Sequence, residues 1–324
     1  MIKKTILCIC ILSMISAASA GIYYAGSNSP AGANQLNSTT DMKISTRGNS
    51  TASVSLNSYS LEVANVYISP SDKATGTLSL QKNSQLTCYG NMTVGAVGFG
   101  KVEVKSGSNV ITNNTYIQTD NSMSWGRAYV DGDGSTWENG GDWTMGGTTN
   151  RYASLDITNN ALVKIGGNFT AAGSYSYITV KTGGRMTVGG TLNFADAVVK
   201  IEDGKVSAGS VFAKNYSAQS DSVTEIILGG SSFGIHAEEN LNAAGTLQIS
   251  LAEDFLITGS TVFDILDWST LTGEFDSVIL PKLDDASLSW DISNLYNDGT
   301  IAVVPEPATM LLLGMGVVLS VRKK

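Results

Sequence analysis

Cysteine, histidine, proline and charge are all scarce in this 324-residue sequence. It has three cysteines, one histidine and five prolines, and 15% of its residues are charged. Cys8 and Cys10 lie in an N-terminal apolar run, which leaves Cys88 as the one cysteine of the body and excludes an internal disulfide there. One histidine and one cysteine cannot form a zinc site of the usual four ligands. We therefore expect packing and backbone pairing to supply stability, without a cofactor.

Positive charge is scarce as well. The chain has 20 lysines and arginines against 28 aspartates and glutamates. Five of the cations lie in the two terminal segments, so the rest of the chain keeps 15 cations against 28 acids, a net charge of −13. Nucleic acid and anionic lipid would both repel such a body, which argues against either as a partner. The charge favours solubility outside the cell.

Long apolar runs are missing too, and the two short ones lie at the chain ends. Residues 6–15 follow two lysines and precede an Ala-Ser-Ala triplet. This order of charge, apolar core and small residues is typical of a secretory signal peptide. We expect residues 1–20 to be removed by cleavage after Ala20, with Ala18 and Ala20 as the small residues of the cleavage site.

Glycine, by contrast, is abundant, with 35 residues. Residues 21–53 are rich in Ser, Asn, Thr and Gly without a period and predict a flexible leader. Residues 54–215 carry triplets of apolar anchors whose first members lie 24, 24, 26, 27, 23 and 21 residues apart. A period of this length is typical of a solenoid. The seven triplets are Leu56, Leu61, Val66; Leu80, Leu86, Met92; Val104, Val110, Tyr116; Val130, Trp137, Trp143; Ile157, Val163, Phe169; Val180, Met186, Leu192; and Ile201, Val206, Val211.

Each repeat also alternates with period two. Leu78 and Leu80 fall on one face of a strand and Ser79 on the other, and turn-forming Gly and Asn residues lie between the strands. Three short strands and three turns predict one coil of a parallel β-helix. We expect an all-β chain with about seven coils, stacked to a length of roughly 30 to 35 Å. The alternative is a β-sandwich, which does not require three evenly spaced anchors in every repeat.

The period is lost from about Tyr216 onward. Residues 216–304 contain several strand-like runs, such as Thr246–Leu251 and Thr300–Val304, but no repeat. We expect this region to form a β cap. Such a cap would cover the edge of the last coil, which would otherwise invite edge-to-edge association.

The C-terminal 20 residues carry three blocks in order: Pro305-Glu306-Pro307, an apolar run over 308–321, and Arg322-Lys323-Lys324. They resemble the PEP-CTERM sorting signal of bacterial exported proteins. The resemblance implies a short hydrophobic helix that inserts transiently into the inner membrane, with its cations on the cytoplasmic side. It also implies processing near the triplet by an exosortase, then delivery to the cell surface or beyond. The alternative is a simple C-terminal membrane anchor.

One repeat supports the same conclusion. Residues 130–146 contain Gly-Asp-Gly-Ser-Thr-Trp, then a small-residue turn, then a strand that ends in Gly. This stretch resembles the repeat shared by autotransporter passengers and PEP-CTERM proteins. The resemblance implies a β-helix in an exported, surface-exposed protein.

Two groups of polar residues are weak candidates for a site. Asp131, Asp133 and Asp142 lie near the positions of a calcium loop, but Thr136 occupies the position that needs glycine. We therefore interpret them as an acidic turn and expect no bound metal. His236 lies next to two glutamates without a nucleophile motif, and we interpret it as a loop histidine of the cap.

Aromatic residues suggest a surface for sugars. Trp137 and Trp143 occupy anchor positions and are expected in the core. Tyr177 belongs to the same group of aromatic residues, and the candidates expected to face outward and stack on a carbohydrate are Trp125, Tyr129, Tyr152 and Tyr175.

These observations predict an exported bacterial protein of the cell surface or extracellular matrix, with a structural or adhesive role and no catalytic activity. Its expected partners are an exosortase and an extracellular polysaccharide. Two alternatives stay open, a polysaccharide-binding module and a polysaccharide lyase or glycosidase on a β-helix. Low charge on the outward positions, without an acid–base cluster, argues against the enzymes.

Overall fold

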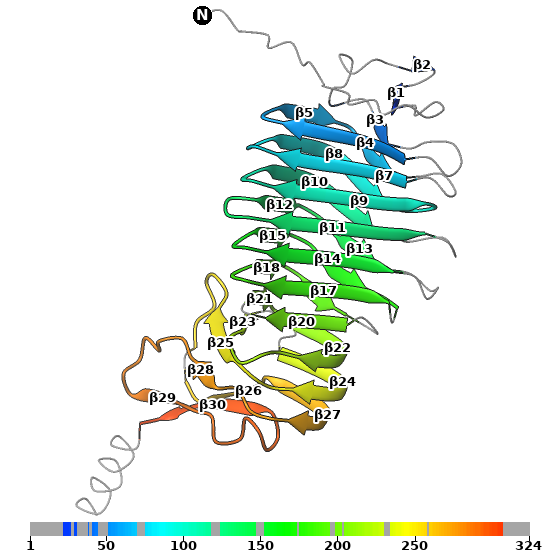
Figure 1. The fold of residues 1–324 in the computed structure, drawn as a ribbon. Helices are drawn as coiled ribbons and strands as arrows, with labels where there is room; N and C mark the ends of the chain where they lie inside the picture. The colour runs from blue at the N-terminus through cyan, green and yellow to red at the C-terminus, as the bar shows by residue number, and fades with distance from the viewer. Residues whose placement is uncertain are drawn as a thin grey trace, which may run out of the picture.

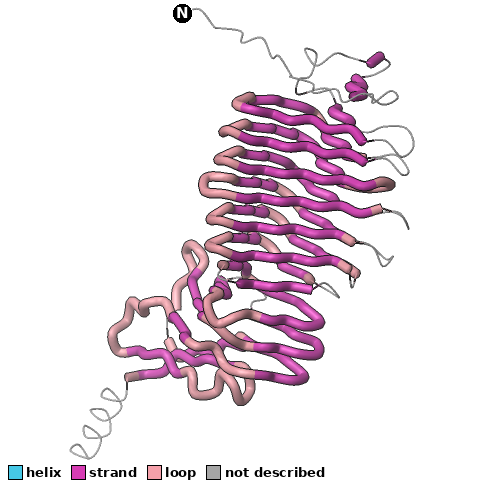
Figure 2. Tube along the Cα trace, in the orientation of Figure 1, coloured by secondary structure: helices cyan, strands magenta, loops and turns pink. Residues whose placement is uncertain are grey.

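The structure is a computed structural model. It describes residues 22–26, 29–30, 38, 41–44, 51–69, 75–117, 124–146, 152–173, 175–194, 198–202, 204–229, 234–257 and 259–306. The expected signal peptide (1–20), the apolar run (308–321) and the C-terminal cations lie outside these residues. Within them every regular element is a strand (Figure 2), and none is a helix that could span a membrane.

The strands form a parallel β-solenoid of about seven turns, as the anchor repeat predicts (Figure 1). One face is a seven-stranded parallel sheet. Its strands are β4 (Thr51–Asn57), β7 (Thr75–Gln81), β9 (Phe99–Lys105), β11 (Trp125–Asp131), β14 (Ala153–Thr158), β17 (Ser176–Lys181) and β20 (Val198–Glu202).

The second and third faces belong to a single larger sheet. The second face contains β5 (Ser60–Val63), the first halves of β8 (Gln85–Val94) and β10 (Asn109–Ile117), β12 (Thr136–Asn139), β15 (Leu162–Ile165), β18 (Arg185–Val188), β21 (Lys205–Ala208), β23 (Val223–Leu228), β25 (Thr246–Leu251) and β28 (Ser277–Ile279). The third contains β3 (Asp41–Ile44), β6 (Val66–Ile68), the second halves of β8 and β10, β13 (Trp143–Met145), β16 (Phe169–Ala171), β19 (Thr191–Asn193), β22 (Ser210–Ser217), β24 (Gly234–Asn242) and β27 (Leu266–Thr272).

The anchors stack in register through the core. In the seven-stranded sheet the first anchors, from Leu56 to Ile201, pair with one another at every step. Almost all anchors are fully buried, and Leu61 is partly buried against the core. Tyr116 is the exception. Between its first and second halves β10 has one residue fewer than β8, so Thr115, not Tyr116, pairs with Met92 and takes the inward position.

Thr115 is polar, and a buried hydrogen-bond network accommodates it. The Asn139 Oδ1 accepts hydrogen bonds from the hydroxyls of Thr112 and Thr115, each at 2.8 Å. Its Nδ2 donates to the carbonyl oxygens of Gly141 and Asp142. The indole nitrogen of Trp137 donates to the Thr112 hydroxyl at 3.1 Å. Every buried polar side chain in this group thus has a partner, as burial requires.

Amide and carboxylate side chains stack at the corner between the second and third faces. In each of three successive coils a side-chain Oδ1 accepts a hydrogen bond from a backbone nitrogen of the next coil, at 2.8 to 2.9 Å. The Asn114 Oδ1 accepts from Asp142, the Asp142 Oδ1 from Asn168, and the Asn168 Oδ1 from Thr191. Glycine precedes Asp142, Asn168 and Thr191 because space is short there. A Cβ on Gly167 would lie 2.4 Å from the Asp142 Oδ1.

The solenoid extends beyond both expected boundaries. Strand β3 lies inside the expected leader and pairs in parallel with β6, because Met42 and Ile44 extend the core. At the other end, the sequence predicted that the coils stop at residue 215, but parallel pairing does not stop there. It continues through β23, β24, β25, β27 and β28. The period is lost there because β22 and β24 lengthen across a bulge, and no further strand joins the seven-stranded sheet.

The remaining strands lie at the two ends. Strands β1 (Ile22–Gly26) and β2 (Ser29–Pro30) pair antiparallel, and β1 pairs antiparallel with β3. The cap is a three-stranded antiparallel sheet of β26 (Thr261–Asp264), β30 (Thr300–Pro305) and β29 (Leu288–Asp291). It lies at the C-terminal end of the solenoid (Figure 1) and buries Phe263, Ile301 and Val303. The cap is therefore smaller than residues 216–304.

Candidate binding face of the seven-stranded sheet

The outer surface of the seven-stranded sheet carries a column of aromatic residues. Phe99 and Trp125 begin β9 and β11 and pair in register. The backbone nitrogens of Gly126 and Ala153 donate to the carbonyl oxygens of Tyr152 and Tyr175, which continues the ladder one residue before β14 and β17. One aromatic residue therefore lies at the same position in each of four successive coils.

The rings of this column contact one another and a neighbouring column. The centroids of Phe99 and Trp125 lie 5.3 Å apart, and those of Tyr152 and Tyr177 lie 5.2 Å apart. Arg127 fills the gap between the two pairs, with its Cζ 4.9 Å from the Trp125 ring and 4.5 Å from the Tyr152 ring. Such distances give favourable cation–π contacts. We call Phe99, Trp125, Tyr152, Tyr175 and Tyr177 the aromatic row.

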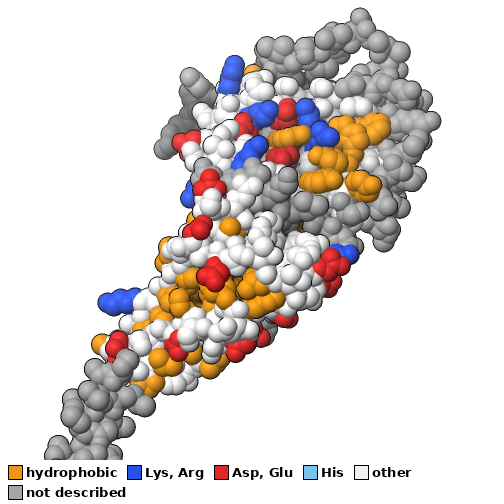
Figure 3. Space-filling view, turned by 60° about the horizontal axis from the view of Figure 1, so that its bottom comes forward, with side chains coloured by type: hydrophobic (Ala, Val, Ile, Leu, Met, Phe, Trp, Pro, Cys, Tyr) orange, Lys and Arg blue, Asp and Glu red, His pale blue; other side chains and the backbone are white. Residues whose placement is uncertain are grey.

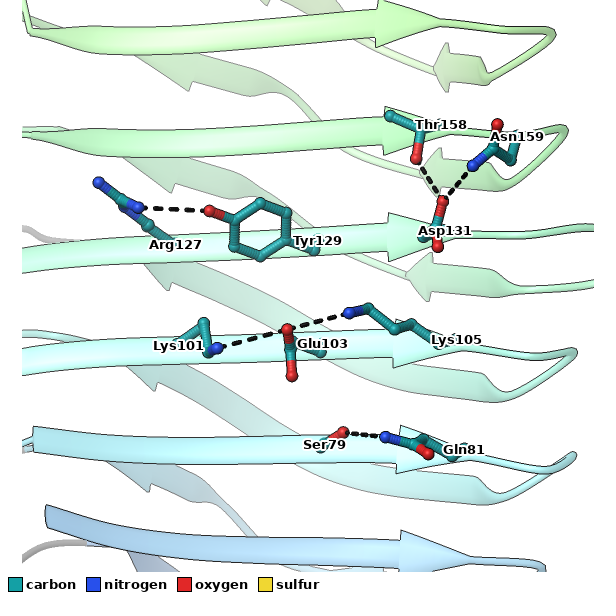
Figure 4. Close-up of polar contacts among 10 residues, drawn as sticks. All are labelled: Ser79, Gln81, Lys101, Glu103, Lys105, Arg127, Tyr129, Asp131, Thr158 and Asn159. Carbon is teal, nitrogen blue, oxygen red and sulfur yellow. Dashed lines mark hydrogen bonds and ion pairs between the residues drawn. The ribbon is translucent and has the colours of Figure 1, made fainter.

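Charged side chains lie on β9 and β11, the strands that begin with Phe99 and Trp125 (Figure 4). On β9, the ammonium groups of Lys101 and Lys105 lie 3.3 and 3.0 Å from the Glu103 Oε1. Burial alone would raise the pKa of Glu103, but the hydrogen bond from Lys105 and both lysine charges outweigh it and hold the pKa below its usual value. Glu103 is thus an ionised carboxylate held by two cations.

Asp156 behaves in the opposite way. Its burial on β14 raises its pKa, against the opposing effects of a hydrogen bond with Thr179 and the charges of Lys181 and Arg127. It lies in register with Tyr129 on β11, which in turn pairs with Glu103 on β9. A carboxylic acid with a raised pKa on an open face is a candidate proton donor.

The three candidate calcium ligands do not form one group. The Asp131 Oδ1 accepts hydrogen bonds from the Thr158 hydroxyl at 2.6 Å and the Asn159 amide at 2.7 Å (Figure 4). Asp142 belongs to the corner stack, and Asp133 is exposed. Among the described residues no three His, Cys, Asp or Glu side chains are grouped as metal ligands.

His236 lies on strand β24 of the solenoid, so the interpretation as a loop histidine of the cap is wrong. Its ring stacks on Phe212 with centroids 4.6 Å apart. Both rings line a pocket of about 360 Å³ together with Asp267 and Ser269. The His236 Nδ1 lies 3.9 Å from the Asp267 Oδ2, and the Ser269 hydroxyl donates to the carbonyl oxygen of Glu238. These contacts do not form a Ser-His-acid relay, which needs a serine hydroxyl bonded to the histidine.

Sequence reasoning found most of the aromatic face. Trp137 and Trp143 are fully buried, as expected for anchors. The candidates Trp125, Tyr129 and Tyr152 are half-buried and Tyr175 is 46% exposed, so all four lie outward, and Tyr177 is half-buried beside them. Phe99 was missed. Its spacing was the available signal, because Phe99, Trp125, Tyr152 and Tyr175 lie 26, 27 and 23 residues apart, as the anchors of the same coils do.

The candidate sorting residues begin where the described chain ends. Pro305 is the last residue of β30 and is exposed. The Glu306 backbone nitrogen donates to the carbonyl oxygen of Ser287 at 2.7 Å, so the cap holds the start of the triplet. Pro307 and the cations Arg322, Lys323 and Lys324 lie outside the described residues.

Comparison with known families identifies this end of the chain. The family model of the PEP-CTERM protein-sorting motif matches residues 303–324. The C-terminal segment is a PEP-CTERM sorting motif. It implies an exported protein that an exosortase processes, and the PEP-CTERM match starts inside β30 of the folded cap. Neither the curated proteins nor the solved structures gave a match.

Proposed function

We propose that this chain is a structural or adhesive protein of the cell surface or extracellular matrix. The observation that carries the proposal is a continuous parallel solenoid, closed by a cap whose last strand, β30, runs into the PEP-CTERM motif. In such a body each coil contacts only its neighbours, which gives an extended surface suited to many weak contacts. The aromatic row and the charged residues beside it are all on one sheet of this surface.

The proposed route has three steps. Residues 1–20 direct export and are removed after Ala20. The apolar run 308–321 then holds the chain in the inner membrane, with the terminal cations on the cytoplasmic side. An exosortase cuts near Pro305-Glu306-Pro307 and releases the folded body toward the surface. Because β30 ends at Pro305, a cut after the triplet leaves the cap complete.

A second candidate function is glycan hydrolysis, and Asp156 is the observation that favours it. Inverting glycosidases place a protonated acid and a carboxylate about 6.5 to 9.5 Å apart. Asp156 and Glu103 lie two strands apart in register, which corresponds to about 9.6 Å at the usual strand spacing. Against this, Tyr129 lies between them and two lysines hold Glu103. We therefore propose that the protein is not an enzyme.

Two measurements test this function in the host bacterium. Protease added to intact cells should digest the processed protein, and deleting its gene should weaken the matrix or the attachment of cells. A protein that stays protected, or a deletion without effect on either property, contradicts the structural or adhesive role. Release of reducing ends from neutral or acidic polysaccharides, lost in Asp156→Asn, would establish the hydrolase instead.

A further inference from the structure

The aromatic row has a direction. Its members come from β9, β11, β14 and β17 or the residue just before them, so the row runs across the strands and along the solenoid axis. Adjacent coils are separated by about 4.8 Å, and the row therefore extends for about 14 Å. A ligand that uses the whole row must be elongated and must lie parallel to the axis.

The row is also rigid. Each aromatic residue lies on a strand or directly before one, and these strands pair on both sides. Arg127 joins the two ring pairs through its contacts with Trp125 and Tyr152, and its Nη1 lies 3.4 Å from the Tyr129 hydroxyl. Its Nε is buried without a hydrogen-bond partner among the described residues. Rings held in this way lose little conformational entropy when a ligand stacks on them.

Charges of both signs are mixed on this face. Beside the row, the cations Lys101, Lys105, Arg127 and Lys181 lie among the acids Glu103, Asp131 and Asp156. Figure 3 shows basic, acidic and hydrophobic side chains gathered close together on part of the visible surface. A polyanion would meet three carboxylates here and a body of net negative charge, which disfavours it.

Apolar ring surfaces flanked by hydroxyl, carboxylate, ammonium and amide groups fit the chemistry of a sugar chain. A sugar ring has apolar C–H faces that stack on aromatic rings and hydroxyls that both donate and accept hydrogen bonds. Tyr129, Thr158 and Thr179 supply such partners on the same sheet. Repeated rings at coil spacing also match a polymer better than a single small molecule.

We propose that the aromatic row binds an uncharged polysaccharide chain that lies along the solenoid axis. The binding deepens the proposed adhesive role and rests on it. Trp125 and Tyr152 lie at the centre of the row and contribute most, whereas Phe99 and Tyr175 extend it at the ends. Arg127 is a positioning residue that fixes the orientation of the two central rings.

The test is affinity electrophoresis of the mature, processed protein in gels that contain one polysaccharide each. The neutral panel is hydroxyethyl cellulose, xylan, mannan, dextran and galactan, and the anionic panel is alginate and polygalacturonate. We expect retardation by at least one neutral polysaccharide and none by the anionic ones. Trp125→Ala or Tyr152→Ala should raise the dissociation constant obtained from the retardation about tenfold. Trp125→Phe should restore most of the affinity.

Tyr89→Ala is the matched control. Tyr89 is a tyrosine of the larger sheet, 54% exposed and away from the row, so its loss should leave binding unchanged. Circular dichroism checks that each variant is folded. Retardation by alginate alone, by no neutral polysaccharide, or equally in all row variants overturns the proposal. Failure of the adhesive role is separate, because it would leave binding in the gel intact while the processed protein remained dispensable in cells.

Discussion

The coils of the solenoid and the C-terminal cap hold their strands together in different ways. In the coils, each strand pairs in parallel with its equivalent one repeat away, as Val163 does with Trp137 and Met186. In the cap, β30 pairs antiparallel with both β26 and β29, and Phe263 meets Ile301, 38 residues later in the chain. The coils form a stack whose members depend on their neighbours, whereas the cap is a single closing unit at one end.

This difference predicts how far a destabilising substitution should unfold the molecule. A defect in a central coil interrupts contacts on both sides, so it should unfold the stack. A defect in the cap exposes one end and leaves the interior ladders in place. Variants in the two regions therefore test directly whether coils and cap respond differently to a defect.

The largest effect is expected from a buried charge. Val163→Asp should abolish the strand signal in circular dichroism, because an unpaired carboxylate in the core costs several kcal/mol and interrupts two ladders. Val303→Asp in the cap should lower the first unfolding midpoint while most of the strand signal remains. Val303 is 1% exposed, so burial alone does not distinguish the two sites. Equal loss of signal in both variants would show that cap and coils fold as one unit.

An intermediate effect is expected from the buried amide of the coils. Asn139→Ala removes the partners of the Thr112 and Thr115 hydroxyls and of two carbonyl oxygens, and should cost about 2 to 3 kcal/mol in urea unfolding. Asn168→Ala, in the exposed corner stack, should cost about 1 kcal/mol or less, because water can replace its bond to Thr191. A cost as large at Asn168 as at Asn139 would mean that the corner stack, not the inner network, holds the coils.

The smallest effect concerns pH and has opposite signs in the two regions. Asp156 has a raised pKa, so its ionisation disfavours the folded coils as pH rises through its folded pKa. Asp156→Asn should therefore raise the melting temperature at pH 7, and the gain should vanish below the ordinary aspartate pKa. In the cap, hydrogen bonds from Ser287 lower the pKa of Asp285. Asp285→Asn should lower cap stability at pH 7 and have no effect once pH falls below that lowered pKa. A change in stability of the same sign for Asp156→Asn and Asp285→Asn at pH 7 would contradict the opposite pKa shifts of the two carboxyl groups.

The sequence predicted the solenoid because each coil repeats one pattern, and repetition turns a weak signal into a strong one. Anchors such as Leu80, Val130 and Val180 lie where the period places them. It failed at Tyr116 because a corner shortened by one residue shifts the inward position without changing the anchor spacing. The end of the stack was misplaced for a related reason, since the bulges of β22 and β24 alter the repeat length while pairing continues.

The candidate site was predicted in part. Trp125 and Tyr152 could be recognised as outward because they are out of phase with the anchors. What the sequence could not show is that Arg127 folds between their rings, since that depends on side-chain conformation across coils. Likewise the spacing of Asp131 and Asp142 imitates a calcium loop, but the fold places Asp131 at the end of β11 and Asp142 in the corner stack.

The central claim is that the folded body is exported and then sorted through its C-terminal motif. The most direct measurement replaces Pro305, Glu306 and Pro307 with alanine in the host and follows the protein by cell fractionation and intact mass. The account predicts that the variant remains in the inner membrane with residues 308–324 attached, while the parent is trimmed and reaches the surface. Pro281→Ala, outside the motif, should be processed like the parent. Trimming and release of the triple variant at the parental rate would contradict the claim.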